Sequence, residues 1–186
     1  MADDVMLGDT PKAKKRRRRL DGVKSSGRLW KHSMLTDLYG LATQDEMERF
    51  FVFTLVRNPW DRMVSYYHWL RAQTFDHPAV GLAKATDFGT FLRAPLTLAS
   101  VKAAPYTRYV TDAEGVERAD LFIRLEHVDT DLAPLEAHLG FRLAPLAHVN
   151  QSNRARDWRA FYGDSEAEIV AELCQADIKR FAYSFS

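Results

Sequence analysis

Cysteine and long apolar runs are what this chain of 186 residues has least of. Its one cysteine, Cys174, excludes an internal disulfide framework, and no cluster of Cys and His residues has the spacing of metal ligands. No apolar run approaches the ~18 residues of a membrane span, and the polar start of the chain lacks the apolar core of a secretory signal. We therefore expect a cytoplasmic protein that has no membrane span and uses no metal.

Net charge is also small, at +1, but the charges are unevenly distributed. Residues 1–32 contain ten Lys or Arg and four Asp, a net charge of +6, which leaves −5 on residues 33–186. Most of the excess positive charge lies in residues 12–19. Such a run can be a solvated segment, a nuclear-localisation signal or nucleic-acid-binding arm, or the edge of a site that attracts an acidic acceptor. Because no alternation of basic and aromatic residues follows this run, we favour a solvated segment and expect no nucleic-acid partner.

The composition, 46% hydrophobic and 12% aromatic, is sufficient for one domain with a sizeable core. Residues 1–27 have no apolar periodicity, and we expect them to form a basic, mobile connection without a packed element. The domain itself is expected over residues 28–186.

Apolar periodicity predicts helices that alternate with two buried strands. Helices or helical turns are expected at residues 29–39, 45–49, 87–93, 129–139, 166–173 and 176–181. Another helix should follow Asn58 or Asp61 as its cap, with Pro59 in its first turn and a broad apolar face of Met63, Tyr66, Tyr67, Trp69 and Leu70. The strands are expected at residues 50–56, as a central strand buried on both faces, and 119–125, with a turn at 112–115 between them. This order indicates an α/β fold with a mainly parallel sheet flanked by helices.

The place where the first strand meets the next helix suits an anion. The N-terminus of a helix offers free backbone N–H groups and the positive end of the helix dipole. Arg57 lies at this position, and its planar group of donors can hold a phosphate by two points. Ser65, about two turns further on, reaches the same phosphate only if the phosphate lies along the helix or the first turn is unwound. The alternative is an ion pair between Arg57 and Asp61, with Ser65 as a small helix contact.

The segment from Phe51 to Tyr67 resembles the 3′-phosphate-binding motif of the sulfotransferase family. In that family a hydrophobic strand precedes Arg-Asn-Pro, two residues, Arg, two residues and Ser. The matching residues here are Arg57, Asn58, Pro59, Arg62 and Ser65. The resemblance implies a P-loop NTPase-like sulfotransferase fold and the co-substrate 3′-phosphoadenosine-5′-phosphosulfate. It also implies transfer of the sulfuryl group to a hydroxyl or amine of a small-molecule or glycan acceptor.

Two later stretches are similar to the carbohydrate sulfotransferases and their bacterial relatives. Residues 120–126 resemble a strand that ends in Arg, a hydrophobic residue and Glu, and residues 148–154 resemble a loop that closes over the donor nucleotide. The resemblance implies Asn150, Ser152 and Arg154 as donor contacts and a carbohydrate as the acceptor. A polar surface loop is the alternative for residues 148–154.

The family's first strand and its Pro-Lys-Thr-Gly-Gly-Thr-Ser type loop, which holds the 5′-phosphosulfate, have no counterpart in this sequence. Thr10-Pro11-Lys12 shares only two letters with that loop. We therefore expect an N-terminally incomplete sulfotransferase fold whose chain starts at an internal methionine. A non-catalytic or truncated nucleotide-binding module is the alternative, and a P-loop kinase is disfavoured because no Walker loop is present.

Sulfuryl transfer also needs a base that takes the proton of the acceptor. His32 is the candidate base, because the adjacent Lys31 would keep its imidazole neutral, and this Lys-His pair resembles the acceptor-side helix of related enzymes. An ordinary, partly exposed histidine is the alternative. His68 could face the donor or pack among aromatic residues, and Glu126 could be a base or the partner of an arginine.

Overall fold

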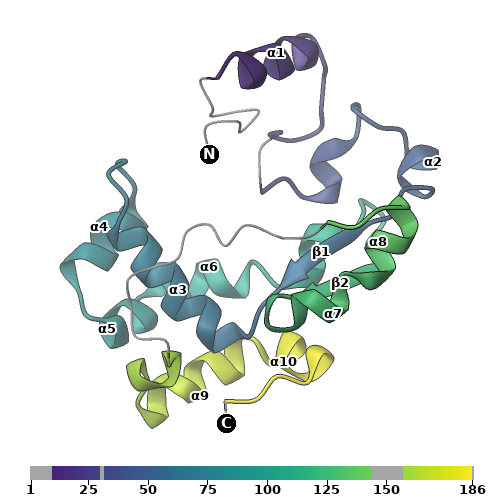
Figure 1. Ribbon diagram of the computed structural model, residues 1–186. Helices are drawn as coiled ribbons and strands as arrows, with labels where there is room; N and C mark the ends of the chain where they lie inside the picture. The colour runs from purple at the N-terminus through teal and green to yellow at the C-terminus, as the bar shows by residue number, and fades with distance from the viewer. Residues whose placement is uncertain (1–9, 30–31, 144–156, 186) are drawn as a thin grey trace. The chain divides into compact units, whose positions relative to one another are not determined.

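The computed structural model describes residues 10–29, 32–143 and 157–185 (Figure 1). Within these ranges the protein is a mostly helical α/β structure with a small, two-stranded parallel sheet. The chain forms two compact units. Unit 1 comprises Met1–Thr54 and Thr107–Phe122, and unit 2 comprises Leu55–Tyr106 and Ile123–Ser186.

In unit 1 the basic run of the N-terminal segment is a helix, α1 (Pro11–Leu20). Our expectation of no packed element over residues 1–27 missed it, because a helix without an apolar stripe leaves no periodic signal. Its start is nevertheless encoded locally. The hydroxyl of Thr10 accepts a hydrogen bond from the backbone N–H of Ala13 at 3.1 Å, and Pro11 occupies the first turn. The side chain of Ala13 is fully buried.

The helix predicted over residues 29–39 is wrong. Apart from residues 30–31, which lie outside the described ranges, this stretch contains only a short 3₁₀ helix, η1 (Leu35–Leu38). The backbone N–H of Ser26 donates to the carbonyl of Tyr39 at 2.8 Å, so the segment pairs with earlier residues instead of with itself. Gly40 ends the segment with φ +90°, and a Cβ there would lie 2.0 Å from the carbonyl oxygen of Lys24.

Two other local predictions for unit 1 are confirmed. The helical turn expected at residues 45–49 is α2 (Gln44–Met47), which begins with a capping box between Thr43 and Glu46. The turn at residues 112–115 is closed by a hydrogen bond from the N–H of Gly115 to the carbonyl of Asp112 at 3.2 Å. Asp112 also binds Arg118, which fixes the turn against the following residues.

The sheet consists of β1 (Phe53–Val56) and β2 (Leu121–Arg124). Both predicted strands therefore exist, but the expectation of a central strand buried on both faces is wrong. Phe53 and Leu55 are 42% and 47% exposed, whereas Val56 and Ile123 are fully buried. With two strands in the described sheet, each strand is an edge, and one face of β1 remains uncovered.

In unit 2 the core forms around α3 (Pro59–Arg71), which packs against α4 (Pro78–Ala85), α5 (Phe88–Arg93) and α9 (Asp164–Leu173) (Figure 1). Of the five residues predicted for the apolar face of α3, Met63, Tyr67 and Leu70 are buried, and Tyr66 and Trp69 are partly buried against the same core. Residues at this spacing share one side of a helix, which explains the pattern. The helices predicted at residues 87–93 and 166–173 correspond to α5 and α9.

The remaining elements of unit 2 are mostly short. The sequence did not indicate α4 or α6 (Pro95–Lys102). The helix predicted at residues 129–139 is divided into α7 (Val128–Asp131) and α8 (Ala133–Leu139), because Pro134 lacks the N–H that a continuous helix needs. The helix predicted at residues 176–181 is α10 (Gln175–Phe181). Three 3₁₀ helices complete the description: η2 (Tyr106–Val110, at the unit boundary), η3 (Leu125–His127) and η4 (Trp158–Phe161).

Candidate functional site

Asn58 lies between β1 and α3 and caps the helix. Its side-chain oxygen accepts hydrogen bonds from the N–H groups of Trp60 at 3.0 Å and Asp61 at 3.4 Å, and its carbonyl accepts from Arg62 at 2.8 Å. Pro59 has no N–H to offer. Asn58 itself donates its backbone N–H to Glu126 at 2.6 Å. The free backbone donors that the sequence predicted at this helix start are therefore all occupied, so an anion here has to be bound by side chains.

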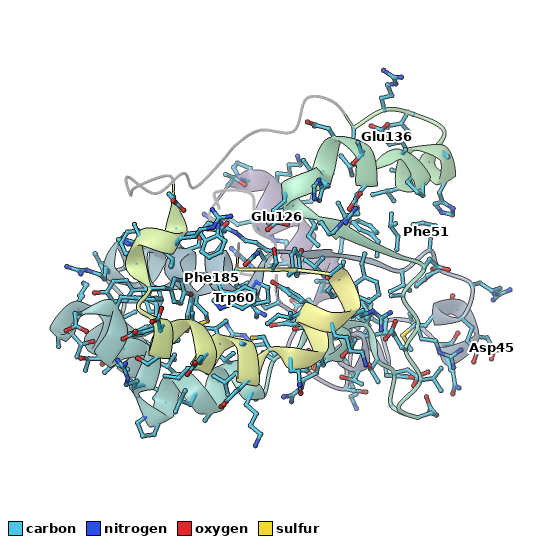
Figure 2. The ribbon with its side chains drawn as sticks, turned by 90° about the horizontal axis from the view of Figure 1, so that it is seen from below. Asp45, Phe51, Trp60, Glu126, Glu136 and Phe185 are labelled. Atoms are coloured by element: carbon cyan, nitrogen blue, oxygen red, sulfur yellow. The ribbon has the colours of Figure 1, made fainter. Side chains whose placement is uncertain are left out.

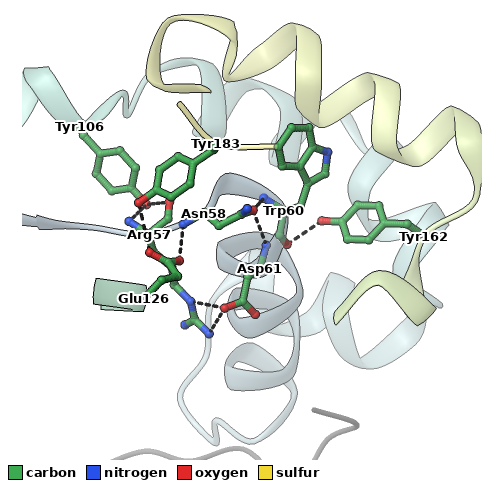
Figure 3. Close-up of polar contacts among 8 residues, drawn as sticks. All are labelled: Arg57, Asn58, Trp60, Asp61, Tyr106, Glu126, Tyr162 and Tyr183. Carbon is green, nitrogen blue, oxygen red and sulfur yellow. Dashed lines mark hydrogen bonds and ion pairs between the residues drawn. The ribbon is translucent and has the colours of Figure 1, made fainter. Parts of the chain in front are cut away.

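The backbone of Arg57 is held on both sides by one hydroxyl group. The hydroxyl of Tyr106 accepts from the N–H of Arg57 at 3.1 Å and donates to its carbonyl at 3.0 Å (Figure 3). Tyr106 is only 7% exposed, and burial raises the pKa of its hydroxyl to about 12. The hydroxyl consequently keeps its proton at neutral pH and remains both a donor and an acceptor.

The guanidinium of Arg57 forms an ion pair with Asp61. Its Nε and Nη2 atoms both lie 2.7 Å from Oδ2 of Asp61. The two side chains are 27% and 15% exposed, and Figure 3 shows the guanidinium extending away from the rings of Tyr106 and Tyr183. Among the described residues, no acceptor contacts Nη1. The ion pair that the sequence left open as an alternative is therefore present, and it leaves one end of the guanidinium accessible.

Ser65 follows Asp61 by one helical turn, so the two side chains lie on the same face of α3. The first turn of α3 is regular, as the Arg62-to-Asn58 hydrogen bond shows. Of the two geometries considered for a shared phosphate, the unwound turn is thus absent. A phosphate held by both Arg57 and Ser65 would have to lie along the side of the helix.

Arg62, the other arginine of the motif, contacts a different set of groups. Its guanidinium carbon lies 4.6 Å from the centre of the Tyr106 ring, and its Nη1 donates to the carbonyl of Ala104 at 3.4 Å. Nearby, burial raises the pKa of Asp177 and raises that of Cys174 to about 11. The thiol of Cys174 is therefore protonated at neutral pH. The structure gives Arg62 a packing contact with Tyr106, which in turn holds Arg57.

Glu126 links this helix start to the C-terminal segment. One of its carboxylate oxygens accepts from the N–H of Asn58, and the other accepts from the hydroxyl of Tyr183 at 3.2 Å. Burial and the nearby carboxylate raise the pKa of Tyr183. The amide of Asn58 also donates to the carbonyl of Ser184 at 3.1 Å, and Phe185 packs edge-on against Trp60, with ring centres 5.6 Å apart (Figure 2). Of the contacts described, Glu126 makes none with an arginine.

The histidine candidates differ in their surroundings. His32 is exposed in a turn before η1, in unit 1, and lies on no helix, contrary to our expectation. Its neighbour Lys31 lies outside the described residues. His68 packs edge-on against the rings of Tyr67 and Phe161, with centres 5.3 and 5.0 Å apart, as in the aromatic alternative.

The predicted donor contacts Asn150, Ser152 and Arg154 also lie outside the described ranges. The structure thus brings together Arg57 and Asp61 at the start of α3, one helical turn before Ser65. It adds Tyr106 and Glu126 as supports. Sequence reasoning missed Tyr106, because no local signal marks a residue 49 positions away as the partner of Arg57.

Three comparisons, with protein-family models, with curated proteins and with solved structures, found no match. The described ranges contain no group of three or more His, Cys, Asp or Glu side chains that could hold a metal ion. Nor do they contain a helix that is both long and apolar enough to cross a membrane. The functional interpretation therefore depends on the motif and on the geometry around it.

Proposed function

We propose that this protein belongs to the sulfotransferases that use 3′-phosphoadenosine-5′-phosphosulfate and that Arg57 and Ser65 bind the 3′-phosphate of this donor. The observation that carries the proposal is the Arg-Asn-Pro, Arg and Ser pattern at a strand-to-helix junction, where Asn58 caps α3 and Pro59 starts it. The corresponding fold is the P-loop NTPase-like sulfotransferase fold, with a larger parallel sheet than the two described strands.

In this proposal each part of the motif has a separate role. The side chain of Asn58 occupies the backbone N–H groups of Trp60 and Asp61, and Pro59 has none. The phosphate is therefore bound by the charged side chain of Arg57 and the hydroxyl of Ser65. A guanidinium binds a phosphate through charge-assisted hydrogen bonds, which are stronger than those between neutral groups. Arg62 supports the site through Tyr106 and adds positive charge nearby.

In the proposed reaction the acceptor oxygen or nitrogen attacks the sulfur atom of the donor, and the bond from sulfur to the bridging phosphate oxygen breaks. The acceptor proton passes to His32, and Lys31 keeps that histidine neutral beforehand. Asn150, Ser152 and Arg154 contact the donor nucleotide. The proposed acceptor is a glycan, and the nucleotide product is adenosine 3′,5′-bisphosphate.

A nucleotide-binding module without turnover is the second candidate. One observation favours it: the 186 residues contain no Gly-rich loop that would hold the 5′-phosphosulfate. Such a module would keep the 3′-phosphate site of Arg57 and Ser65 and would bind the bisphosphate without transferring sulfate.

Calorimetric titration of the 186-residue chain tests the proposed site. We expect saturable binding of adenosine 3′,5′-bisphosphate and at least about tenfold weaker binding of adenosine 5′-monophosphate, which lacks the 3′-phosphate. Equal affinities, or no binding of the bisphosphate, would contradict the proposal. A sulfuryl-transfer assay with the intact donor and glycan acceptors then separates an enzyme from a binding module.

A further inference from the structure

The ion pair between Arg57 and Asp61 uses only part of the guanidinium. A guanidinium carries five N–H donors, one on Nε and two on each terminal nitrogen. Asp61 accepts from Nε and Nη2 through the single oxygen Oδ2, with both distances 2.7 Å. The pair therefore occupies the Nε side of the group. The two N–H groups of Nη1 and the second N–H of Nη2 remain at its outer end, where no described residue contacts Nη1.

We infer that Asp61 is the positioning residue of this site: its carboxylate fixes the guanidinium of Arg57 so that the outer end meets a terminal phosphate monoester, and it stays in place when the phosphate binds. This inference rests on the proposed function. One N–H of Nη1 and the second N–H of Nη2 can together meet two oxygens of a phosphate, a two-point contact that lysine cannot provide.

The surroundings of the pair favour positioning over competition. A competing carboxylate would have to leave before phosphate binds, but the outer end is open while Asp61 remains in contact. Arg57 is also fixed at its backbone by the hydroxyl of Tyr106. With both ends held, the side chain has already lost the rotamer freedom that phosphate binding would otherwise have to remove.

The half-burial of the pair strengthens this effect. At 27% and 15% exposure, the two charges are screened less by water and salt than a fully exposed pair on a helix surface. Asp61 also lies in the first turn of α3, next to the positive end of the helix dipole, which attracts its carboxylate. These contacts hold the carboxylate of Asp61 in place when a phosphate approaches Arg57.

The variant Asp61→Asn tests the inference, because it keeps the size of the side chain and removes its charge. We expect the dissociation constant for adenosine 3′,5′-bisphosphate to rise about tenfold, which corresponds to ~1.4 kcal/mol. The matched control is Asp131→Asn, which disrupts a second pair between an arginine at a strand end and an aspartate of the next helix. The control should leave this dissociation constant unchanged.

A double-mutant cycle separates positioning from a general effect on folding. In an Arg57→Ala background, Asp61→Asn should cause no further loss of affinity, since Asp61 acts through Arg57. A loss of equal size in both backgrounds would overturn the inference. So would an unchanged or tighter affinity of Asp61→Asn in the otherwise unaltered chain, because a competing carboxylate predicts tighter binding.

Melting temperatures of all variants, and the second variant Asp61→Glu, guard against a protein that merely fails to fold. Asp61→Glu keeps the charge and should retain more affinity than Asp61→Asn, and the reverse order overturns the inference. Failure of the unaltered chain to bind the bisphosphate would overturn the proposed function and this inference together. Binding by the unaltered chain with no effect of Asp61→Asn would overturn only the inference.

Discussion

Unit 2 contains two junctions at which an arginine, at the end of a strand or directly after it, pairs with an aspartate of a following α-helix. At the end of β1, Arg57 contacts only Oδ2 of Asp61. At the end of β2, the Nε and Nη2 atoms of Arg124 bind Oδ2 and Oδ1 of Asp131 at 2.8 and 3.0 Å, and its backbone N–H binds Oδ2 at 3.0 Å. The second pair thus engages both carboxylate oxygens of Asp131 and also the backbone N–H of Arg124, which links the end of β2 to α7.

The residues that follow the two arginines also differ. Arg57 precedes a 13-residue helix that presents Ser65 eight positions later. Arg124 precedes the three residues of η3 and the four residues of α7, and Leu132 stands eight positions after it. An arginine at a strand end is therefore insufficient for a phosphate site. A regular helix with a hydroxyl on the same face distinguishes the first junction from the second.

The largest expected effect follows from removing the arginine of each junction. Arg57→Ala should weaken binding of adenosine 3′,5′-bisphosphate by ~2 kcal/mol or more, because a charge-assisted contact is lost. Arg124→Ala should lower the melting temperature and leave the affinity unchanged. Calorimetry and thermal unfolding measure the two effects, and an equal loss of affinity in both variants would remove the distinction between the junctions.

The support behind the first junction is tested by Tyr106→Phe. This change removes the hydroxyl that contacts both backbone groups of Arg57, so we expect a loss of ~1–2 kcal/mol in unfolding free energy and weaker bisphosphate binding. The control is Tyr67→Phe, which loses a hydroxyl donated to the carbonyl of Thr86 at 2.7 Å. If both variants lose stability but neither loses affinity, Tyr106 serves folding alone.

The hydroxyl on α3 is expected to contribute less. Ser65→Ala should weaken bisphosphate binding by ~1 kcal/mol, as for one neutral hydrogen-bond donor, with almost no change in melting temperature. Ser65→Thr, which retains a hydroxyl, is the comparison variant and should recover part of the affinity. Identical titration curves for Ser65→Ala and the unaltered chain would show that the phosphate does not reach this turn of the helix.

The smallest effect concerns the pH dependence of the second junction. Hydrogen bonds from Arg124 lower the pKa of Asp131 to about 2, from an ordinary value near 3.8. Because the folded-state pKa is lowered, the stabilisation is complete above pH ~4 and is lost as the pH falls toward 2. We expect Asp131→Asn to remove ~0.5–1 kcal/mol of this dependence in denaturant titrations between pH 5 and pH 2. Parallel curves for the two proteins would contradict the assignment.

Local signals limited the cap of α3 to Asn58 or Asp61 and placed Pro59 in the first turn, and the structure has Asn58 as the cap. The spacing of Met63, Tyr67 and Leu70 likewise predicted the buried face of α3. The same kind of signal failed for residues 29–39, where contacts between Ser26 and Tyr39 replace a helix.

The supports of the candidate site could not be predicted from local patterns. Tyr106 and Glu126 contact residues 57–58 from 49 and 68 positions further along the chain. These two residues accept hydrogen bonds from the backbone N–H groups of Arg57 and Asn58. Tertiary contacts are therefore part of the reason why the predicted backbone anion site was wrong. Which end of the Arg57 guanidinium stays accessible is likewise a matter of side-chain geometry that spacing does not determine.

The hydrogen bond from Asn58 to Ser184 has a consequence for how the protein is made. Its two partners are 126 positions apart, so the residue that caps α3 acquires this contact only after 126 further residues have left the ribosome. Closing so long a loop is entropically costly and belongs to the slow part of folding. A nascent chain would therefore build α3 early and complete the surroundings of Arg57 last.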